Sequence, residues 1–257
     1  MKQFDYGIIG FSGAIGRAIT KEFTIRDYRL LLIGRSITHD ANHQYFEWKI
    51  GDKCSEIMKS CSTIIYCAYS RSLPIDAEPF NDLNVLGITK IINSLSEDQH
   101  FILISSKSAG MQSKSHYGKV KFFQEMIASK HPYSKILRVP WLENHQSSHL
   151  GRAKGLMAKI AFLDIFNVIS WRFLEIETCH IHNILQAILD RESYGNFQEI
   201  EASGTIRGSL GLGTKIKNTR SWASFLVNRL MLSILFLFRR IGPRKTRLLA
   251  DSALSLF

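Results

Sequence analysis

The sequence predicts an α/β fold built on a doubly wound parallel sheet. A short apolar run at the start of the chain passes through a glycine-rich turn into a helical stretch. Further apolar runs then alternate with helical stretches through the first half of the chain. These runs lack a strict alternation of apolar and polar residues, which is typical of strands covered on both faces.

The first apolar run leads into a turn with glycines at positions 10, 13 and 16. Gly10 permits a sharp turn out of the strand, Gly13 lets the backbone approach a pyrophosphate, and Gly16 lets the next helix pack closely. The helix expected over 14–24 points unpaired N–H groups at an anion. An ordinary strand-to-helix turn can also use three glycines, but the flanking strand and helix favour a dinucleotide site.

The remaining elements follow in order along the chain. We expect strands near 6–10, 29–34, 45–49, 63–68, 101–105 and 135–139, and helical stretches near 14–24, 53–60, 79–95 and 117–129. This alternation predicts right-handed crossovers between parallel strands. Ligands of such sheets bind at the carboxyl ends of the strands, where the strand order reverses.

The composition indicates one globular domain with a charged extension. The chain has 257 residues and a net charge of +11, but residues 203–257 carry ten lysines and arginines against Asp251 alone. That segment therefore has a net charge of +9, and +2 remains for the rest. We expect a nucleotide-binding domain over 1–202, with a small substrate lobe at about 141–202, and a basic amphipathic extension over 203–257.

The extension contains an apolar stretch over 222–238 that is followed by Arg239 and Arg240. The stretch is short for a spanning helix, which needs about 20 apolar residues. Two interpretations remain: a helix packed on the fold or on a second subunit of a homodimer, or an interfacial anchor facing anionic lipid headgroups. The sequence shows no nucleic-acid-binding motif. We expect a cytoplasmic protein, either free or at the inner face of the membrane.

The cysteines and the first residues of the sequence also favour a cytoplasmic protein. Cys54, Cys61, Cys67 and Cys179 have no paired short spacing, which favours reduced thiols over a metal or redox motif. The first strand and its glycine turn occupy the place of a cleavable signal peptide. No metal site is expected.

The second strand ends in Gly34-Arg35-Ser36 instead of an acidic residue. An acidic side chain there would accept hydrogen bonds from the ribose hydroxyls of NAD, whereas a guanidinium pairs with the 2′-phosphate of NADP. The sequence therefore favours NADP, with NAD as the alternative and Arg17 as a second candidate cation. A solvated surface arginine is the other interpretation of Arg35.

A buried strand over 101–105 delivers serine hydroxyls at its carboxyl end, and Tyr117 and Lys121 follow on a helix. A spacing of four residues places both side chains on one helix face. A nearby ammonium favours the phenolate form of a tyrosine, whose pKa is ordinarily about 10. Tyr45 and Lys49 have the same spacing but lie in an expected strand, where they would stand about 13 Å apart.

In this order and spacing the motifs resemble the short-chain dehydrogenase/reductase family, over about residues 5–200. The resemblance is to its extended branch of NAD-dependent epimerases and dehydratases, which act on nucleotide sugars. It implies a Rossmann fold and a catalytic triad of Ser106, Tyr117 and Lys121. It also implies that Asn84, in Asn84-Val85-Leu86-Gly87, supports a water that relays protons to the lysine.

The resemblance also implies the cofactor contacts. Asp52 resembles the residue at the adenine edge, although a helix N-cap is the other interpretation of this residue. The expected cofactor-binding residues are Gly10, Ser12, Gly13, Ile15, Gly16, Arg35, Ser36, Asp52, Ala68, Tyr69, Lys121 and Pro140.

The expected function is NAD(P)-dependent oxidation or reduction of a carbon in a nucleotide- or lipid-linked sugar. One alternative is a sugar-nucleotide 4-epimerase or dehydratase with retained NAD. Another is a non-catalytic cofactor-binding or membrane-attached subunit. The short interval between Ser106 and Tyr117 leaves Ser105 as a second candidate for the serine of the triad.

Overall fold

In the computed structural model, the described residues are 2–35, 43–70, 78–142, 177–190 and 197–205, with the single residues 233, 237 and 240. Within them, seven parallel strands form one sheet in the order β3-β2-β1-β4-β5-β6-β9. The order reverses between β1 and β4, which lie side by side. The α/β, doubly wound prediction is confirmed.

The strands from β1 to β6 lie where the apolar runs predicted them, with small shifts at the ends, whereas β9 was not among the predicted runs. Their bounds are Phe4–Ile9 for β1, Leu30–Gly34 for β2, Gln44–Glu47 for β3, Cys61–Tyr66 for β4, His100–Ser106 for β5, Ser134–Val139 for β6 and Phe197–Glu199 for β9. The edge strand β9 pairs with β6 through Ile136 and Phe197.

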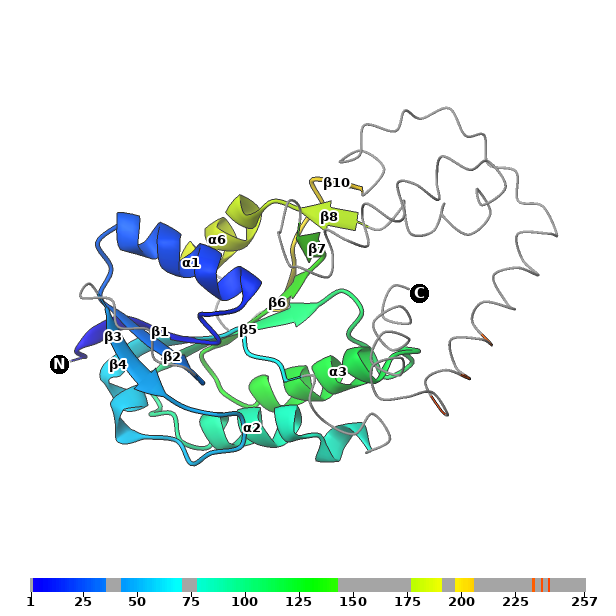
Figure 1. Ribbon diagram of the computed structural model, residues 1–257, viewed down its shortest axis with the longest axis horizontal. Helices are drawn as coiled ribbons and strands as arrows, with labels where there is room; N and C mark the ends of the chain where they lie inside the picture. Colours follow the sequence, from blue (N-terminus) through cyan, green and yellow to red (C-terminus); the bar gives the residue numbers. More distant parts are fainter. Residues whose placement is uncertain are drawn as a thin grey trace.

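Helices cover both faces of the sheet (Figure 1). Helices α1 (Ala14–Ile25) and α6 (Ile181–Leu189) lie over one face, and α2 (Leu83–Ile92) and α3 (His116–Ala128) lie over the other. Each face has its own buried core, because alternate residues of a strand point to opposite sides. In β1, for example, Ile8 joins the core beneath α1 and α6, and Ile9 joins the core beneath α2.

The helix expected near 53–60 is a short 3₁₀-helix, η1 (Glu56–Ser60). The residues before it form a turn instead, in which the Asp52 carboxylate accepts a 2.8 Å hydrogen bond from the backbone N–H of Lys49. Ser55 is the N-cap, and its hydroxyl accepts from the N–H of Ile57. Asp52 is therefore not a helix N-cap.

The helix expected near 79–95 is divided into η2 (Pro79–Asn81) and α2. Asp82 separates them because its backbone is extended, with ψ at 138°. Its side chain accepts a 2.8 Å hydrogen bond from the N–H of Asn84 and so caps α2. The start of α2 is thus fixed by a buried carboxylate.

A second, three-stranded sheet lies beyond the carboxyl end of β6 (Figure 1). It has the order β10-β8-β7, with β7 at Trp141–Leu142, β8 at Glu177–Cys179 and β10 at Gly204–Thr205. Most of the expected substrate lobe, and nearly all of the basic extension with its apolar stretch, lie outside the described residues. None of the helices that the structure describes is long and apolar enough to span a membrane.

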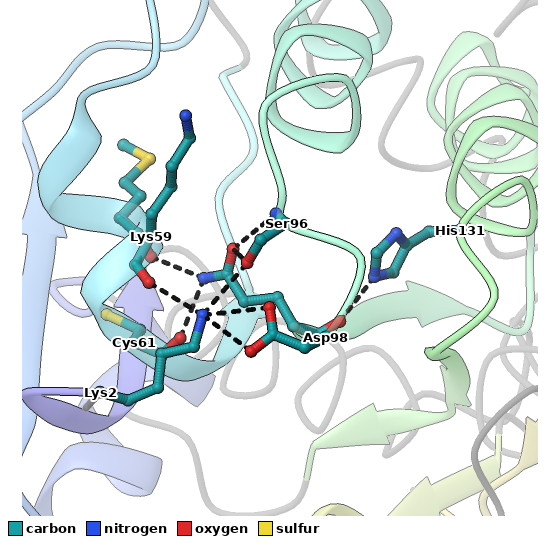
Figure 2. A network of polar contacts seen from close by, with 8 residues as sticks. Lys2, Lys59, Cys61, Ser96, Asp98 and His131 are labelled. Carbon is teal, nitrogen blue, oxygen red and sulfur yellow. Dashed lines mark hydrogen bonds and ion pairs between the residues drawn. The ribbon is translucent and has the colours of Figure 1, made fainter.

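A polar network lies at the amino-terminal ends of the central strands, and Figure 2 shows part of it. The buried Gln99 side chain donates to the carbonyl oxygens of Met58 (2.7 Å) and Cys61 (3.0 Å). The ammonium of Lys2 donates to the carbonyl oxygen of Lys59 and to the Ser96 hydroxyl, both at 3.1 Å. These contacts hold the amino-terminal ends of the strands together, on the side of the sheet opposite the carboxyl ends.

Candidate functional site

The glycine turn after β1 packs directly against the end of β4. Gly10 has a φ of +87°, a conformation that side chains rarely adopt, and an added Cβ would lie 2.8 Å from the backbone of Ala68. A Cβ on Gly16 would overlap the carbonyl oxygen of Gly10 and lie 2.7 Å from the Cα atom of Phe11. The turn and the first helix therefore touch at a distance that only glycine permits.

The N-terminus of α1 is suited to an anion. Its N-cap is Gly13, which has no side chain to accept from the first-turn N–H groups, and the first turn holds no acidic residue. Ser12 and Gly13 are exposed, whereas Ile15 packs partly against the core. Arg17 donates a hydrogen bond to the carbonyl oxygen of Ser12. Phosphate groups bind such uncapped helix ends.

Arg35 is exposed at the carboxyl end of β2, one residue beyond Gly34. The ring of Phe11 lies over Gly34, where an added Cβ would be 2.8 Å from it, and packs edge-on against Tyr45 at 5.6 Å. Arg35 therefore follows the strand that packs beside the glycine turn. Ser36 lies outside the described residues.

Tyr117 and Lys121 lie on α3 and meet a residue from the loop after β4. The rings of Tyr117 and Tyr69 are edge-to-face, with centroids 4.8 Å apart. The ammonium nitrogen of Lys121 lies 5.6 Å from the centroid of the Tyr69 ring. The structure therefore brings Tyr69, Tyr117 and Lys121 together at the carboxyl end of β4, where the glycine turn also packs.

Lys121 is buried, and its ammonium donates a 3.0 Å hydrogen bond to the carbonyl oxygen of Ile104. Burial lowers the pKa of Lys121 to about 8, while Cys67 and Glu125 act in the opposite direction. Burial also raises the pKa of the Cys67 thiol to about 12. The site thus holds an amine that can gain or lose a proton near neutral pH.

The two serines at the end of β5 have different partners. The Ser105 hydroxyl is buried and donates a 2.6 Å hydrogen bond to Glu125. The Ser106 hydroxyl lies 3.0 Å from the hydroxyl of Ser108, whose backbone packs on Gly118, the residue after Tyr117. Ser106 therefore leads into the loop that packs on the first turn of α3, whereas Ser105 belongs to the packing between β5 and α3.

Glu125 and Arg138 were not predicted from the sequence. The guanidinium of Arg138 donates to both carboxylate oxygens of Glu125, at 2.9 and 2.7 Å, and stacks 4.3 Å from the Phe197 ring centroid. Glu125 lies one helical turn after Lys121. A charged residue in a buried strand, as Arg138 is, is the sequence signal that could have indicated a buried ion pair.

Asn84 is buried in α2, and its side chain holds the loop after β4. Its amide oxygen accepts from the N–H of Ser70 (2.7 Å), and its amide nitrogen donates to the carbonyl oxygen of Ser70 (2.9 Å) and to Asp82 (2.8 Å). Its backbone carbonyl accepts from Gln124 at 3.0 Å. The amide group thus contacts protein atoms that fix the loop carrying Tyr69.

The remaining candidates border this region. Pro140 is buried directly after β6, where the Val139 carbonyl accepts a 3.1 Å hydrogen bond from the N–H of Lys107. Asp52 is exposed in the turn before η1. No group of three or more histidine, cysteine or acidic side chains in the described ranges could hold a metal ion.

The arrangement can support proton transfer beside a bound dinucleotide. A phenol and an amine share one helix face, a hydroxyl lies at the end of the neighbouring strand, and an uncapped helix N-terminus lies across the reversal in strand order. These groups fit a dinucleotide in outline: the glycine turn leaves room for a pyrophosphate, and the phenol and amine lie at the carboxyl end of β4.

Comparison with family models gave no match, and no curated protein matched the sequence. Similar solved structures include a short-chain dehydrogenase/reductase superfamily protein from Agrobacterium tumefaciens with bound NAD (TM-score 0.59, 13% identity, 80% of each chain covered). They also include UDP-N-acetylglucosamine 4-epimerase from Bacillus cereus (TM-score 0.54, 13% identity, 82% of each chain). A third is dTDP-glucose 4,6-dehydratase from Bacillus anthracis in complex with NAD (TM-score 0.56, 15% identity, 82% of this chain and 83% of that one).

These similarities extend over about four-fifths of both chains in each pair. The chain has the Rossmann fold of short-chain dehydrogenase/reductase and NAD-dependent epimerase/dehydratase structures.

Proposed function

We propose that this chain is an NAD(P)-dependent oxidoreductase of the short-chain dehydrogenase/reductase type. It would reduce or oxidise a carbon of a nucleotide- or lipid-linked sugar. The observation that carries the proposal is the meeting of Tyr117 and Lys121 beside Tyr69 at the carboxyl end of β4. Structures of the same fold that bind NAD, and one that acts on a UDP-sugar, support the cofactor and substrate classes.

The cofactor would lie across the carboxyl ends of the strands. Gly10, Gly13 and Gly16 would hold the pyrophosphate, together with the N–H groups at the start of α1. Arg35 would pair with the 2′-phosphate of NADP, and Lys121 would contact the nicotinamide ribose. When bound, the nicotinamide would supply or accept the hydride.

Each catalytic side chain would have a separate task. The Ser106 hydroxyl would hydrogen-bond the substrate oxygen, and the Tyr117 phenol would donate its proton to that oxygen during reduction, or accept it during oxidation. The Lys121 ammonium would favour the ionised phenol by its charge. The partners of Asn84 support a role in fixing the loop after β4. Support of a proton-relaying water by Asn84 is implied by the family resemblance alone.

Turnover of a panel of 4-keto and 4-hydroxy nucleotide sugars with NADPH or NADH tests the reaction. We expect Tyr117→Phe to lose at least about a hundredfold in kcat, because general acid–base groups contribute about 10²–10⁴-fold. The ring remains in place, so cofactor binding should persist. Cofactor binding with no turnover, and no change in Tyr117→Phe, would indicate the non-catalytic module instead.

Cofactor preference is tested by fluorescence titration with NADPH and NADH. Arg35→Ala should weaken NADPH binding about tenfold, the loss expected for one charge-assisted contact, and leave NADH binding unchanged. Lys130→Ala, an exposed cation just beyond α3, is the matched control. Equal affinity of the wild type for NADPH and NADH would contradict the proposed pairing of Arg35 with the 2′-phosphate.

The epimerase or dehydratase is the second candidate, because two of the similar structures carry those activities in their names. Such a reaction returns the hydride to the substrate, so no net cofactor would be consumed. NAD retained in the purified protein, with conversion of a nucleotide sugar in the absence of added cofactor, would favour this candidate over the reductase.

A further inference from the structure

Tyr69 contacts both members of the candidate proton-transfer pair. Its ring stands at 77° to that of Tyr117, with centroids 4.8 Å apart, and the ammonium of Lys121 lies 5.6 Å from its centroid. The family resemblance implies a cofactor contact at this position. The structure adds a contact with the side chains that would carry the reaction.

The backbone on both sides of Tyr69 is held in place. The N–H of Cys67 donates a 2.9 Å hydrogen bond to the carbonyl oxygen of Ile9, and Ala68 packs on Gly10. On the other side, the amide group of Asn84 bonds both the N–H and the carbonyl oxygen of Ser70. The backbone that carries the Tyr69 ring is therefore held by contacts with β1 and α2.

The same polar contacts extend to the start of α3. Asp82 accepts a hydrogen bond from the amide nitrogen of Asn84, and its second oxygen lies 2.8 Å from Nε2 of His116. His116 directly precedes Tyr117, and all three of these polar side chains are buried. The loop that carries Tyr69 and the helix that carries Tyr117 are thus joined by a continuous chain of hydrogen bonds.

We propose that Tyr69 is a positioning residue whose ring fixes the phenol of Tyr117 and helps to keep Lys121 charged, an inference that rests on the proposed function. An edge-to-face contact favours one orientation of the partner ring. The face of an aromatic ring attracts a cation, and more strongly where water is excluded. The hydroxyl group of Tyr69 has no part in either effect.

The surroundings of Lys121 define the expected pH dependence. The amine faces the carbonyl oxygen of Ile104 on β5 and the ring of Tyr69, and it is influenced by Cys67 after β4 and by Glu125 on α3. An apolar side chain in place of the ring would keep the site dry but remove the attraction for the cation. The lysine would then lose its proton at a lower pH.

Tyr69→Leu and Tyr69→Phe form a matched pair of variants. In Tyr69→Leu we expect kcat to fall at least about tenfold, because a small misplacement of a reacting group is costly, and the alkaline limb of the kcat profile to move down by about half a pH unit. Tyr69→Phe keeps the ring, so it should leave the alkaline limb at its wild-type pH. An unmoved limb in Tyr69→Leu, or an equal shift in Tyr69→Phe, would overturn the proposal.

A measurement that needs no turnover separates this inference from the proposed function. In protein labelled with ¹³Cε-lysine, the Lys121 resonance is assigned by its loss in Lys121→Met and is titrated by NMR. Its pKa should be about half a unit lower in Tyr69→Leu and unchanged in Tyr69→Phe. Failure of turnover with this shift present would refute only the proposed function; an unchanged pKa in Tyr69→Leu would refute the role of Tyr69.

Discussion

Ser105 donates its hydroxyl hydrogen to Glu125 at 2.6 Å, whereas its neighbour Ser106 pairs with Ser108. The difference follows from the strand: consecutive residues of β5 point to opposite faces of the sheet, and α3 covers only one of them. Glu125 in turn binds the guanidinium of Arg138 through both oxygens. The two serines are therefore not interchangeable, and the Ser105 side chain joins β5 to α3.

This packing role predicts a large effect on stability. Glu125→Gln removes the buried carboxylate and leaves Arg138 only the exposed Glu199, at 3.8 Å, as a charged partner, so we expect a loss of about 3 kcal/mol in the free energy of unfolding. Ser105→Ala should cost about 1 kcal/mol. Urea denaturation measures both. Glu56→Gln, which removes an exposed ion pair with Lys59, should cost less than about 1 kcal/mol, and equal losses in Glu125→Gln and Glu56→Gln would contradict the buried role.

Gly16→Ala tests the close contact between the glycine turn and α1. The new methyl group would overlap the carbonyl oxygen of Gly10, so we expect a loss of about 1–3 kcal/mol in stability and of NAD(P)H binding. Gly110→Ala is the control, because a Cβ there meets no atom within 4 Å. Thermal melting and fluorescence titration measure the two effects. Unchanged cofactor affinity in a folded Gly16→Ala protein would argue against a pyrophosphate at this turn.

Burial of Lys121 predicts that its contribution to stability varies at alkaline pH. Its pKa is lowered from 10.5 to about 8 in the folded chain, so the unfolded chain binds more protons between these values. Stability should therefore rise with pH across this window, by about 3 kcal/mol at most. Denaturation of wild type and Lys121→Met between pH 7 and 11 measures the difference. Parallel curves for the two proteins would exclude the lowered pKa.

The lowered pKa of Asp82 predicts that stability also rises with pH in the acid range. Burial alone would raise its pKa, but hydrogen bonds from His116 and from Asn84 outweigh burial and lower the pKa below 3.8. A lowered carboxylate pKa stabilises the fold above the unfolded value, and this stabilisation is lost as pH falls through the folded value. The stability advantage of wild type over Asp82→Asn should therefore be present at pH 6 and shrink below about pH 4. A constant advantage down to pH 2 would contradict the shift.

Much of this architecture could be predicted from local sequence. The strands from β1 to β6 are apolar runs, and the turn at Gly10 needs a backbone that only glycine adopts readily. Segments that depend on one side-chain contact were harder to predict. Asp82 ends η2 and starts α2, a division that the helical pattern of the sequence does not reveal.

In the candidate site, too, some features could be predicted from the sequence and others could not. Tyr117 and Lys121 could be placed on one face of a helix from their spacing, and their roles remain predictions. Ser105 could not be separated from Ser106, because the answer depends on which face of β5 is covered by Glu125. The contacts of the Tyr69 ring could likewise not be predicted, since Asn84, a residue from another element, holds the loop that carries it.

The contact between Phe11 and Gly34 has an evolutionary consequence. The ring fills the space that any side chain at position 34 would need, with an added Cβ only 2.8 Å away. The two positions should therefore covary: related sequences with a larger residue at position 34 should have a smaller residue at position 11. A library that randomises both codons and selects for folded protein would recover such compensated pairs.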